Sequence, residues 1–459
     1  MSKFISLDKC LYILLIILSI LMPFRELLSL YVGDIIKFIP DVLTLLLLMY
    51  YIIKNKFKIK LRIIDFLFLA FIFTGLISTL YNHSSIMGFI AQTRSISVMY
   101  CLFYLLRVIP LEEKKYITIF KIIFYTSIAL IIMAISEAIT DKHLFFPLEW
   151  AQSIKFESNF DRVYGLLNNP NTFAIYLLLI MLMTWFLSEK EKLKVNWVYY
   201  YLSLTTIFLT SSRSTLILLI LLLIFLLIWI IKNKKYFKIA TISFLLIASF
   251  SSTFLINFGN KVILEEFYNG KRIDFIYAPD YNPSNPTETP VTPPLEESEN
   301  NETQGGSILE RVEEILSGKT FTDSLTNGRI YNILLGLRIF KDNLLFGTGF
   351  GTFGSAGSRI AGSHIYEEYN IHNQFYADNE YIKVLVETGI IGTLIYCSFL
   401  LAFGISSLKN VYKFLLFAIT IFTGMFYNIF ELQVIMFLIY LFFVIFDYYN
   451  KKEKSKINN

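Results

Sequence analysis

Five of the arginines that lie in or beside apolar stretches point to anion binding: Arg94, Arg162, Arg213, Arg329 and Arg338. An arginine in such a place costs about 2.5–3.5 kcal/mol on insertion scales, so it usually has a partner or a function. A guanidinium group binds phosphate and diphosphate through paired hydrogen bonds. All except Arg94 are expected on the outer side of the membrane, where the positive-inside rule disfavours them, and these four form a candidate diphosphate-binding set. For any one of them alone, the alternative is an interfacial side chain whose charge reaches water.

Two carboxylates and two histidines are candidates for proton transfer. Asp378 and Glu380 stand where a loop is expected to enter an apolar helix, and either can act as a base toward a hydroxyl group. The alternative is an N-cap or first-turn acid on that helix, which we favour for Glu380 and leave open for Asp378. His364 and His372 fit better as polar loop residues, although His372 stays a catalytic candidate.

Residues 349–354 fit the GxGxxG pattern, but a nucleotide site requires a preceding strand, and here a helix is expected. We therefore reject a nucleotide-binding function. Cys10, Cys101 and Cys397 lie in or beside apolar stretches without a CxxC pair, and we expect small buried hydrophobic side chains. No histidine cluster forms, so the sequence predicts neither a metal site nor a cofactor.

The composition excludes a soluble protein. Of 459 residues, 55% are hydrophobic and only 17% are charged, with a mean hydropathy of +0.57. Soluble domains carry about 25% charged residues, so this chain cannot cover the surface of several such domains. A secreted disulfide scaffold, a nucleic-acid binder and a disordered protein are excluded as well. The composition predicts an all-α polytopic membrane protein.

Apolar runs of membrane-spanning length predict twelve helices. They lie near 10–24, 35–53, 63–80, 86–106, 116–138, 166–187, 196–210, 214–231, 239–257, 380–405, 411–428 and 431–447. The first run lacks a small-residue cleavage site after it, so we interpret it as a retained anchor rather than a signal peptide.

Lysine and arginine set the expected orientation, because cytoplasmic loops are enriched in them. More than half of the 41 basic residues fall in every second gap between the expected spans and at both ends of the chain. The other short gaps hold few. This alternation predicts that both termini are cytoplasmic.

One long loop divides the chain into three parts. Residues 1–257 hold nine expected spans, 258–379 form an extracytoplasmic loop, and 380–459 hold three spans and a basic tail. Within the loop, 279–306 is rich in proline and glutamate and is expected to be disordered. Residues 328–346 show helical apolar spacing with a basic face, which predicts an amphipathic helix on the outer membrane surface.

Four segments resemble those of a known family: RVYGLLNNPNTFAIYLLL, LTSSRSTLILLI, NGRIYNILLGLRIFKDNLLFGTGFGTFG and DNEYIKVLVETGIIGTLIY. In this order, with one long loop before span ten, they resemble the O-antigen ligase and O-antigen polymerase (WaaL and Wzy) superfamily of bacterial membrane glycosyltransferases, with a GT-C-like architecture. Asp378 stands where the ligases have histidine, and this variant resembles the polymerase branch. His372 stays an alternative for the same role.

The resemblance implies an inverting, metal-independent glycosyl transfer at the outer face of the bacterial inner membrane. Arg213 and Arg329, and less closely Arg162, match the family's functional arginines and would neutralise a leaving diphosphate. Asp378 would orient or deprotonate the acceptor hydroxyl group. The implied partners are undecaprenyl diphosphate-linked glycan donor and acceptor molecules for O-antigen, capsule or exopolysaccharide, and a possible chain-length regulator.

Two other functions stay open. A ligase would transfer a finished glycan to lipid or protein, and Asp378 in place of histidine argues against it. A flippase or transporter would show internal repeats and charges deep in several helices. Here the polar residues gather at one edge and in one loop, and no repeat is found.

Overall fold

The computed structural model describes most of the chain outside its long loop. The described residues are 6–139, 162–167, 169–191, 196–232, 234, 237–267, 328–372, 375–408 and 410–458. The proline-rich insert expected at 279–306 lies outside them. All regular elements in the described residues are helical.

The helices follow the predicted apolar segments. The first nine are α1 (Leu7–Val32), η1 with α2 (Asp34–Phe38, Ile39–Lys54), α3 (Ile63–Tyr81), α4 (Ile86–Val108), α5 (Glu113–Ile139), α7 (Pro170–Lys190), α8 (Trp197–Leu209), α9 (Arg213–Lys232) and α10 (Phe237–Phe267). The last three are α16 (Glu380–Ser407), α17 (Val411–Gly424) and α18 (Gln433–Asn458), with η5 (Ile429–Glu431) between the last two.

Ten helices in the described residues are long and apolar enough to cross a membrane, and α8 and α17 are shorter apolar helices. The all-helical, polytopic membrane fold is therefore confirmed. The number of twelve spans stays a prediction, because α8 and α17 have only 13 and 14 residues.

Apolar side chains cover both the inside and the outside of this bundle. On α1, Leu11, Leu15 and Leu18 are fully buried, while Ile13 and Ile17 on the same helix are 44% and 38% exposed. A soluble helix would carry polar residues on that outer face. The exposed face of α1 therefore fits contact with lipid.

Helix α18 forms the centre of the bundle. Its residues from Ile435 to Phe446 are buried on all sides, as expected of a helix enclosed by others. The ring of Tyr440 stacks on Phe103 of α4 at 4.6 Å, and Phe443 stacks on Phe403 of α16 at 4.5 Å. These contacts fix α4 and α16, which carry part of the candidate site.

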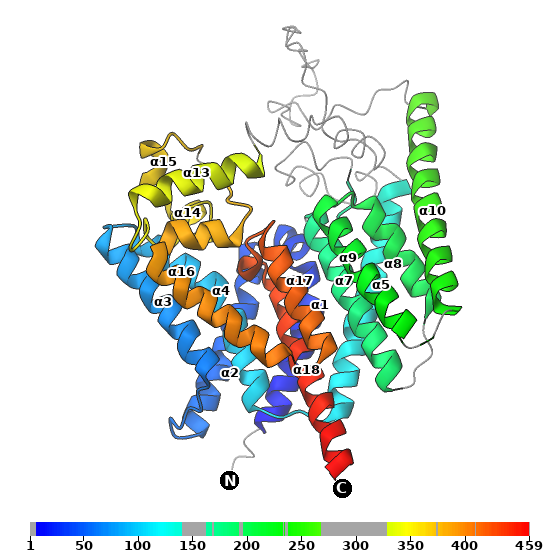
Figure 1. The fold of residues 1–459 in the computed structure, drawn as a ribbon, viewed down its shortest axis with the longest axis horizontal. Helices are drawn as coiled ribbons and strands as arrows, with labels where there is room; N and C mark the ends of the chain where they lie inside the picture. Colours follow the sequence, from blue (N-terminus) through cyan, green and yellow to red (C-terminus); the bar gives the residue numbers. More distant parts are fainter. Residues whose placement is uncertain are drawn as a thin grey trace.

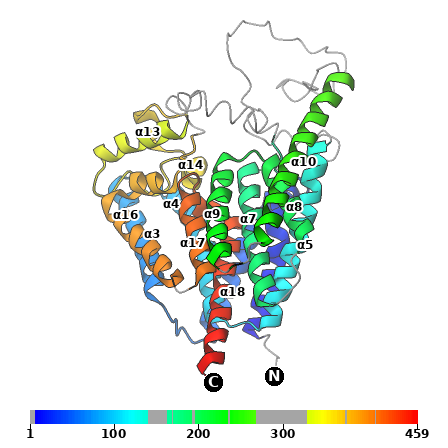
Figure 2. The ribbon, with the colours of Figure 1, turned by 45° about the vertical axis from the view of Figure 1, so that its right-hand side comes forward.

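Three further helices lie across one end of the bundle: α13 (Arg329–Asp342), α14 (Ala356–Ala361) and α15 (His364–Glu368). Figures 1 and 2 show them above α3, α4 and α16, with both chain termini at the opposite end. We call the end that carries α13 the loop end. Helix α10 stands on the far side of the bundle from α13 in both views.

The predicted amphipathic helix is present as α13, within the expected 328–346. Leu335, Gly336 and Ile339 form its buried side. An added Cβ at Gly336 would lie 2.3 Å from the Ile382 side chain of α16, so glycine permits this close packing. Leu334 on the other side is 53% exposed. Contact of that side with a membrane surface stays a prediction.

A broken helix and a glycine-rich loop hold the loop end in place. Helix α16 is interrupted at Gly389, which has φ 62° and ψ −163°. The amide of Gly349 donates to the Glu387 carbonyl at 3.1 Å, and the amide of Ile390 donates to the Leu344 carbonyl at 2.9 Å. The break therefore exposes backbone groups of α16 to the loop 344–354. A short α14, with no preceding strand in the described chain, follows this loop, in line with the rejected nucleotide function.

The cysteines differ from the expectation in one case. Cys10 and Cys101 are half-buried, whereas Cys397 is exposed on α16. The prediction of a buried side chain is wrong for Cys397, because an apolar segment in a membrane bundle has a face that packs on no other helix.

Candidate functional site

The start of α16 separates the roles of two neighbouring residues. Asn379 is the N-cap, because its Oδ1 accepts hydrogen bonds from the amides of Tyr381 and Ile382, both at 3.0 Å. Asp378 precedes it with φ 47°, a left-handed conformation that is uncommon outside glycine. The N-cap interpretation of Asp378 is therefore wrong, and its carboxylate is available for other contacts.

Burial and two arginines determine the charge of Asp378. Burial raises the pKa of Asp378 to about 6, while the positive charges of Arg329 and Arg359 act in the opposite direction. A carboxyl group with this pKa is mostly ionised at neutral pH and still takes up a proton readily. These are the properties of a general base that works near neutral pH.

Arg329 begins α13 and reaches toward the corner between α17 and η5. Its guanidinium lies 5.5 Å from the ring centres of both Phe426 and Tyr427. Its Nε atom is buried and has no hydrogen-bond partner in the described part of the chain. Arg329 therefore stands beside Asp378 with a hydrogen-bond donor left for a ligand.

Arg359 is a site residue that the sequence did not indicate. It lies on α14 with its guanidinium 4.3 Å from the ring centre of Tyr376, two residues before Asp378. The side chain is exposed. The surrounding sequence GSRIAG has no helical apolar pattern, so only the fold brings Arg359 to this carboxylate.

Arg213 and Arg162 lie at the turn between α8 and α9. Arg213 is the first residue of α9, and the hydroxyl group of its neighbour Ser214 lies 2.5 Å from the Tyr427 hydroxyl group. Tyr427 thus contacts both the α9 start and Arg329. Arg162 is 7% exposed, and its Nε donates to the Thr210 carbonyl at 2.8 Å. The structure therefore brings Arg162, Arg213 and Arg329 to one corner of the loop end.

The other predicted residues lie apart from this corner. Arg338 is exposed on α13, nine residues after Arg329, which places it about 13 Å further along the helix and on the opposite side. His372 is exposed, and its carbonyl accepts a hydrogen bond from the Phe375 amide at 2.9 Å. Arg94 pairs with Asp41 at 3.5 Å near the start of α2.

A buried ionic cluster lies directly behind the site. The Lys383 ammonium, 1% exposed, is 3.1 Å from Glu380 and 2.7 Å from Glu431. Gln92 of α4 donates to Glu431 at 3.0 Å, and so does the amide of Ala356 at the start of α14. We call these four side chains, Gln92, Glu380, Lys383 and Glu431, the buried lysine cluster. It joins α4, α14, α16 and η5.

One feature of the sequence indicated this cluster. Lys383 falls inside a predicted span, where an ionisable side chain is rare and usually paired or functional. Glu380 is a first-turn acid of α16, which is the interpretation that we favour from the sequence. It also forms an ion pair with Lys383. In the described residues, no three histidine, cysteine, aspartate or glutamate side chains are arranged to hold a metal ion.

Glu387 fastens the glycine-rich loop to α16. It is fully buried, and its Oε1 accepts a hydrogen bond from the Phe353 amide at 3.0 Å. Its carbonyl accepts from Gly349 and from the Ser78 hydroxyl group. The E-T-G motif thus positions the loop that leads to α14 and Arg359.

One family model matches part of this chain. Residues 198–397 match the family model described as O-antigen ligase. The match covers Arg213, α13, α14 and the start of α16, and it supports the O-antigen ligase and polymerase superfamily without distinguishing the polymerase branch. No curated protein matches the chain. The chain is an integral membrane protein, and the matched family model points to a membrane enzyme that processes lipid-linked glycans.

Proposed function

We propose that this protein is a polymerase of lipid-linked oligosaccharide repeat units. The observation that carries the proposal is the half-buried Asp378, influenced by Arg329 and Arg359, at the end of the bundle opposite the termini. In the expected topology that end faces outward from the inner membrane of a bacterium. Undecaprenyl diphosphate is the lipid carrier that the family resemblance implies.

The reaction is a single inverting displacement. The Asp378 carboxylate accepts the proton of an acceptor hydroxyl group, whose oxygen attacks the anomeric carbon of the donor glycan. The bond from that carbon to the diphosphate breaks, and the diphosphate leaves with the electron pair. Arg329 and Arg213 stabilise its growing charge, and Arg162 supports the α8–α9 turn that carries Arg213. No step requires a metal ion.

The experiment is a complementation test in a deletion strain, followed by mass analysis of lipid-linked glycans. The proposal predicts single repeats in the deletion strain. Asp378→Asn, Arg213→Ala and Arg329→Ala proteins should leave them unpolymerised. Lys341→Ala, which removes an exposed charge from α13, is the matched control and should restore polymer. Full restoration by the arginine variants at normal expression would contradict the proposed diphosphate contacts.

A ligase is the second candidate, because the matched family model carries that description. A ligase defect strands full-length polymer on the lipid carrier instead of single repeats. In that case His372, six residues before Asp378, is the first residue to replace.

A further inference from the structure

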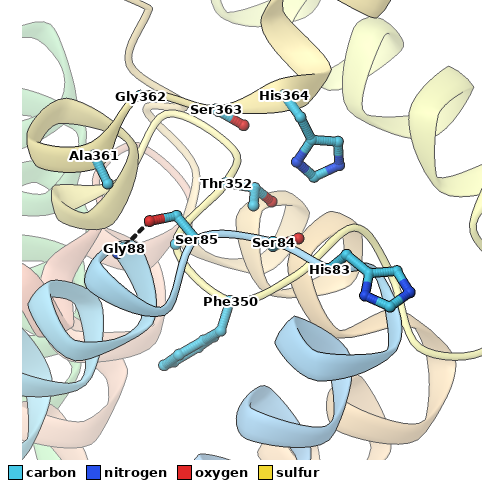
Figure 3. Close-up of a pocket in the computed structure, with 11 residues that line it drawn as sticks. His83, Ser84, Ser85, Gly88, Phe350, Thr352, Ala361, Gly362, Ser363 and His364 are labelled. Carbon is cyan, nitrogen blue, oxygen red and sulfur yellow. Dashed lines mark hydrogen bonds between the residues drawn. The ribbon is translucent and has the colours of Figure 1, made fainter.

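A second polar pocket lies at the loop end, apart from Asp378. Its volume is about 310 Å³, at the lower end of the range for small-molecule sites. Three separate segments line it: the turn before α4 (83–88), the glycine-rich loop (350–352) and the connection from α14 to α15 (361–364). Figure 3 shows His364 on the upper side and His83 on the lower side of the pocket, with Thr352 and Ser84 at intermediate height to their left.

The lining offers hydrogen-bond donors and no carboxylate. Two of the four histidines of the chain meet here, together with Ser84, Ser85, Ser363 and Thr352. The Ser363 hydroxyl group is buried and has no hydrogen-bond partner among the described residues. Burial lowers the pKa of His364, against the opposing charge of Glu368, and both the neutral and the charged imidazole carry an N–H donor. Such a lining suits an oxyanion.

A bare sugar fits this pocket poorly. Sugar sites commonly present carboxylates or an open aromatic face, and Phe350, the aromatic residue of the lining, is 1% exposed. Its ring packs against Phe71 of α3 at 5.5 Å rather than facing the pocket.

An apolar surface leads to the pocket. Phe66, Leu69, Phe73 and Leu80 share one face of α3, and each is more than half exposed. Beyond them, at the end of α3 and the start of α4, Tyr81, Ile86, Met87 and Ile90 are 47–67% exposed. A polar pocket at the end of an exposed apolar stripe matches a molecule with an anionic headgroup and a long hydrocarbon tail.

We propose that this pocket holds the diphosphate headgroup of a second lipid-linked molecule, the acceptor of the polymerisation, with its tail along α3. The identification as acceptor rests on the proposed function. Helix α14 connects the two sites, because Ala361 and Gly362 line the pocket while Arg359 acts on Asp378. Its six residues span about 9 Å, so the first sugars of a headgroup-bound acceptor can reach Asp378.

The test uses a matched pair of variants at Ser363, the N-cap of α15. Aspartate and asparagine are both good N-caps, so Ser363→Asp and Ser363→Asn should fold alike. Only aspartate places a negative charge against a bound diphosphate. The His83→Asn/His364→Gln double variant removes donors instead, and asparagine tolerates the left-handed φ of 51° at residue 83.

The measurement is native mass spectrometry of the purified full chain with undecaprenyl diphosphate, counting bound lipids. Wild type and Ser363→Asn should bind two molecules. Ser363→Asp and the histidine double variant should bind one, with a loss of affinity at the second site of about tenfold or more. Lys56→Gln, which removes a positive charge from the opposite end, should still bind two. Two molecules bound to Ser363→Asp would overturn the proposal.

Two further probes identify the source of the headgroup. If phosphatidylglycerol fills the second site as readily as the lipid diphosphate does, that result would contradict an acceptor site. Inorganic diphosphate should bind more weakly, because it lacks the tail. Counting bound lipids involves no turnover, so a failed polymerase assignment, recognised by the glycans of the deletion strain, is distinguishable from a failed pocket assignment.

Discussion

The charge of Asp378 depends on groups that are distant in sequence. Burial in the segment before α16 raises its pKa, and Arg329 and Arg359 hold the increase to a final pKa of about 6. An exposed aspartate would already be ionised about two pH units lower. Besides the diphosphate contact proposed for Arg329, the two arginines lower the pKa of Asp378 and so keep it able to accept a proton.

Activity should rise with pH through about 6, as Asp378 loses its proton and becomes a base. Arg359→Gln removes a positive charge that lowers this pKa, so the pKa of Asp378 rises further. The acid limb of the pH–activity profile then moves to higher pH. We expect a displacement of about 0.5–1 unit, since Arg359 is exposed and partly screened. The measurement is the pH dependence of polymerisation by purified protein.

Arg359→Lys serves as the control for this displacement. It keeps the positive charge, so its acid limb should stay near that of the wild type. An unmoved limb in Arg359→Gln would show that Asp378 does not control the pH dependence.

At the scale of elements, α16 carries the largest share of the positioning. Its first turn follows Asp378, its Lys383 anchors the buried lysine cluster, and its Glu387 and Gly389 receive the glycine-rich loop. Because α14 begins with an amide that donates to Glu431, the same cluster also places Arg359. The positions of Asp378 and Arg359 relative to each other thus depend on α16 and on the segments that pack against it.

Lys383→Met should destabilise the protein strongly. It leaves Glu380 and Glu431 buried without their cation, and removal of one partner from a buried pair typically costs about 3–5 kcal/mol. The thermal unfolding midpoint in detergent measures the effect. A Lys383→Met/Glu431→Gln double variant should recover part of the loss, because it removes a stranded charge. Lys341→Met on exposed α13 is the control, and an equal loss there would contradict the argument.

Gly389→Ala should disturb the contact between α16 and the glycine-rich loop. An added Cβ would lie 2.4 Å from the Leu345 carbonyl oxygen and 2.6 Å from the Gly347 amide, at a φ of 62°. We expect a lower unfolding midpoint and loss of polymerisation. Gly33→Ala shares the positive φ, at 87°, but its Cβ would meet no atom within 4 Å. It should therefore show only the conformational cost of about 1–3 kcal/mol.

At the scale of the whole molecule, the bundle separates two ends. The termini and the turn between α2 and α3 lie at one end, and α13, α14 and α15 lie at the other (Figures 1 and 2). The basic residues of the α2–α3 turn, at 54–62, follow the pattern expected of a cytoplasmic loop. In the predicted topology, the loop end is the outer face.

Single cysteines should report this orientation. In a protein whose three native cysteines are replaced, Lys341→Cys on α13 should react with a membrane-impermeant maleimide in intact cells. Lys56→Cys in the α2–α3 turn should react only after the membrane is made permeable. Labelling of Lys56→Cys in intact cells would reverse the proposed topology and place the candidate site in the cytoplasm.

Much of the architecture was predictable from local sequence. Apolar run length locates each helix, because a bilayer core sets the number of residues needed to cross it. The start of α16 at Glu380, the extent of α13 and the turns at the glycines followed from composition and spacing alone. The arginines were visible because a guanidinium in an apolar context is costly.

The partners of those residues depended on tertiary structure. Arg359 acts on Asp378, Lys383 pairs with Glu431, and His83 and His364 line one pocket, although the members of each pair come from segments that are distant in the chain. Apolar periodicity carries no information on which helices are neighbours, since every span presents a similar face to lipid and to its neighbours. The sequence therefore determined the membrane-spanning helices and the charged residues that are candidates for the site. Only the packing of the helices decided which of these charged residues share a site, because burial and proximity set the chemistry of each charged group.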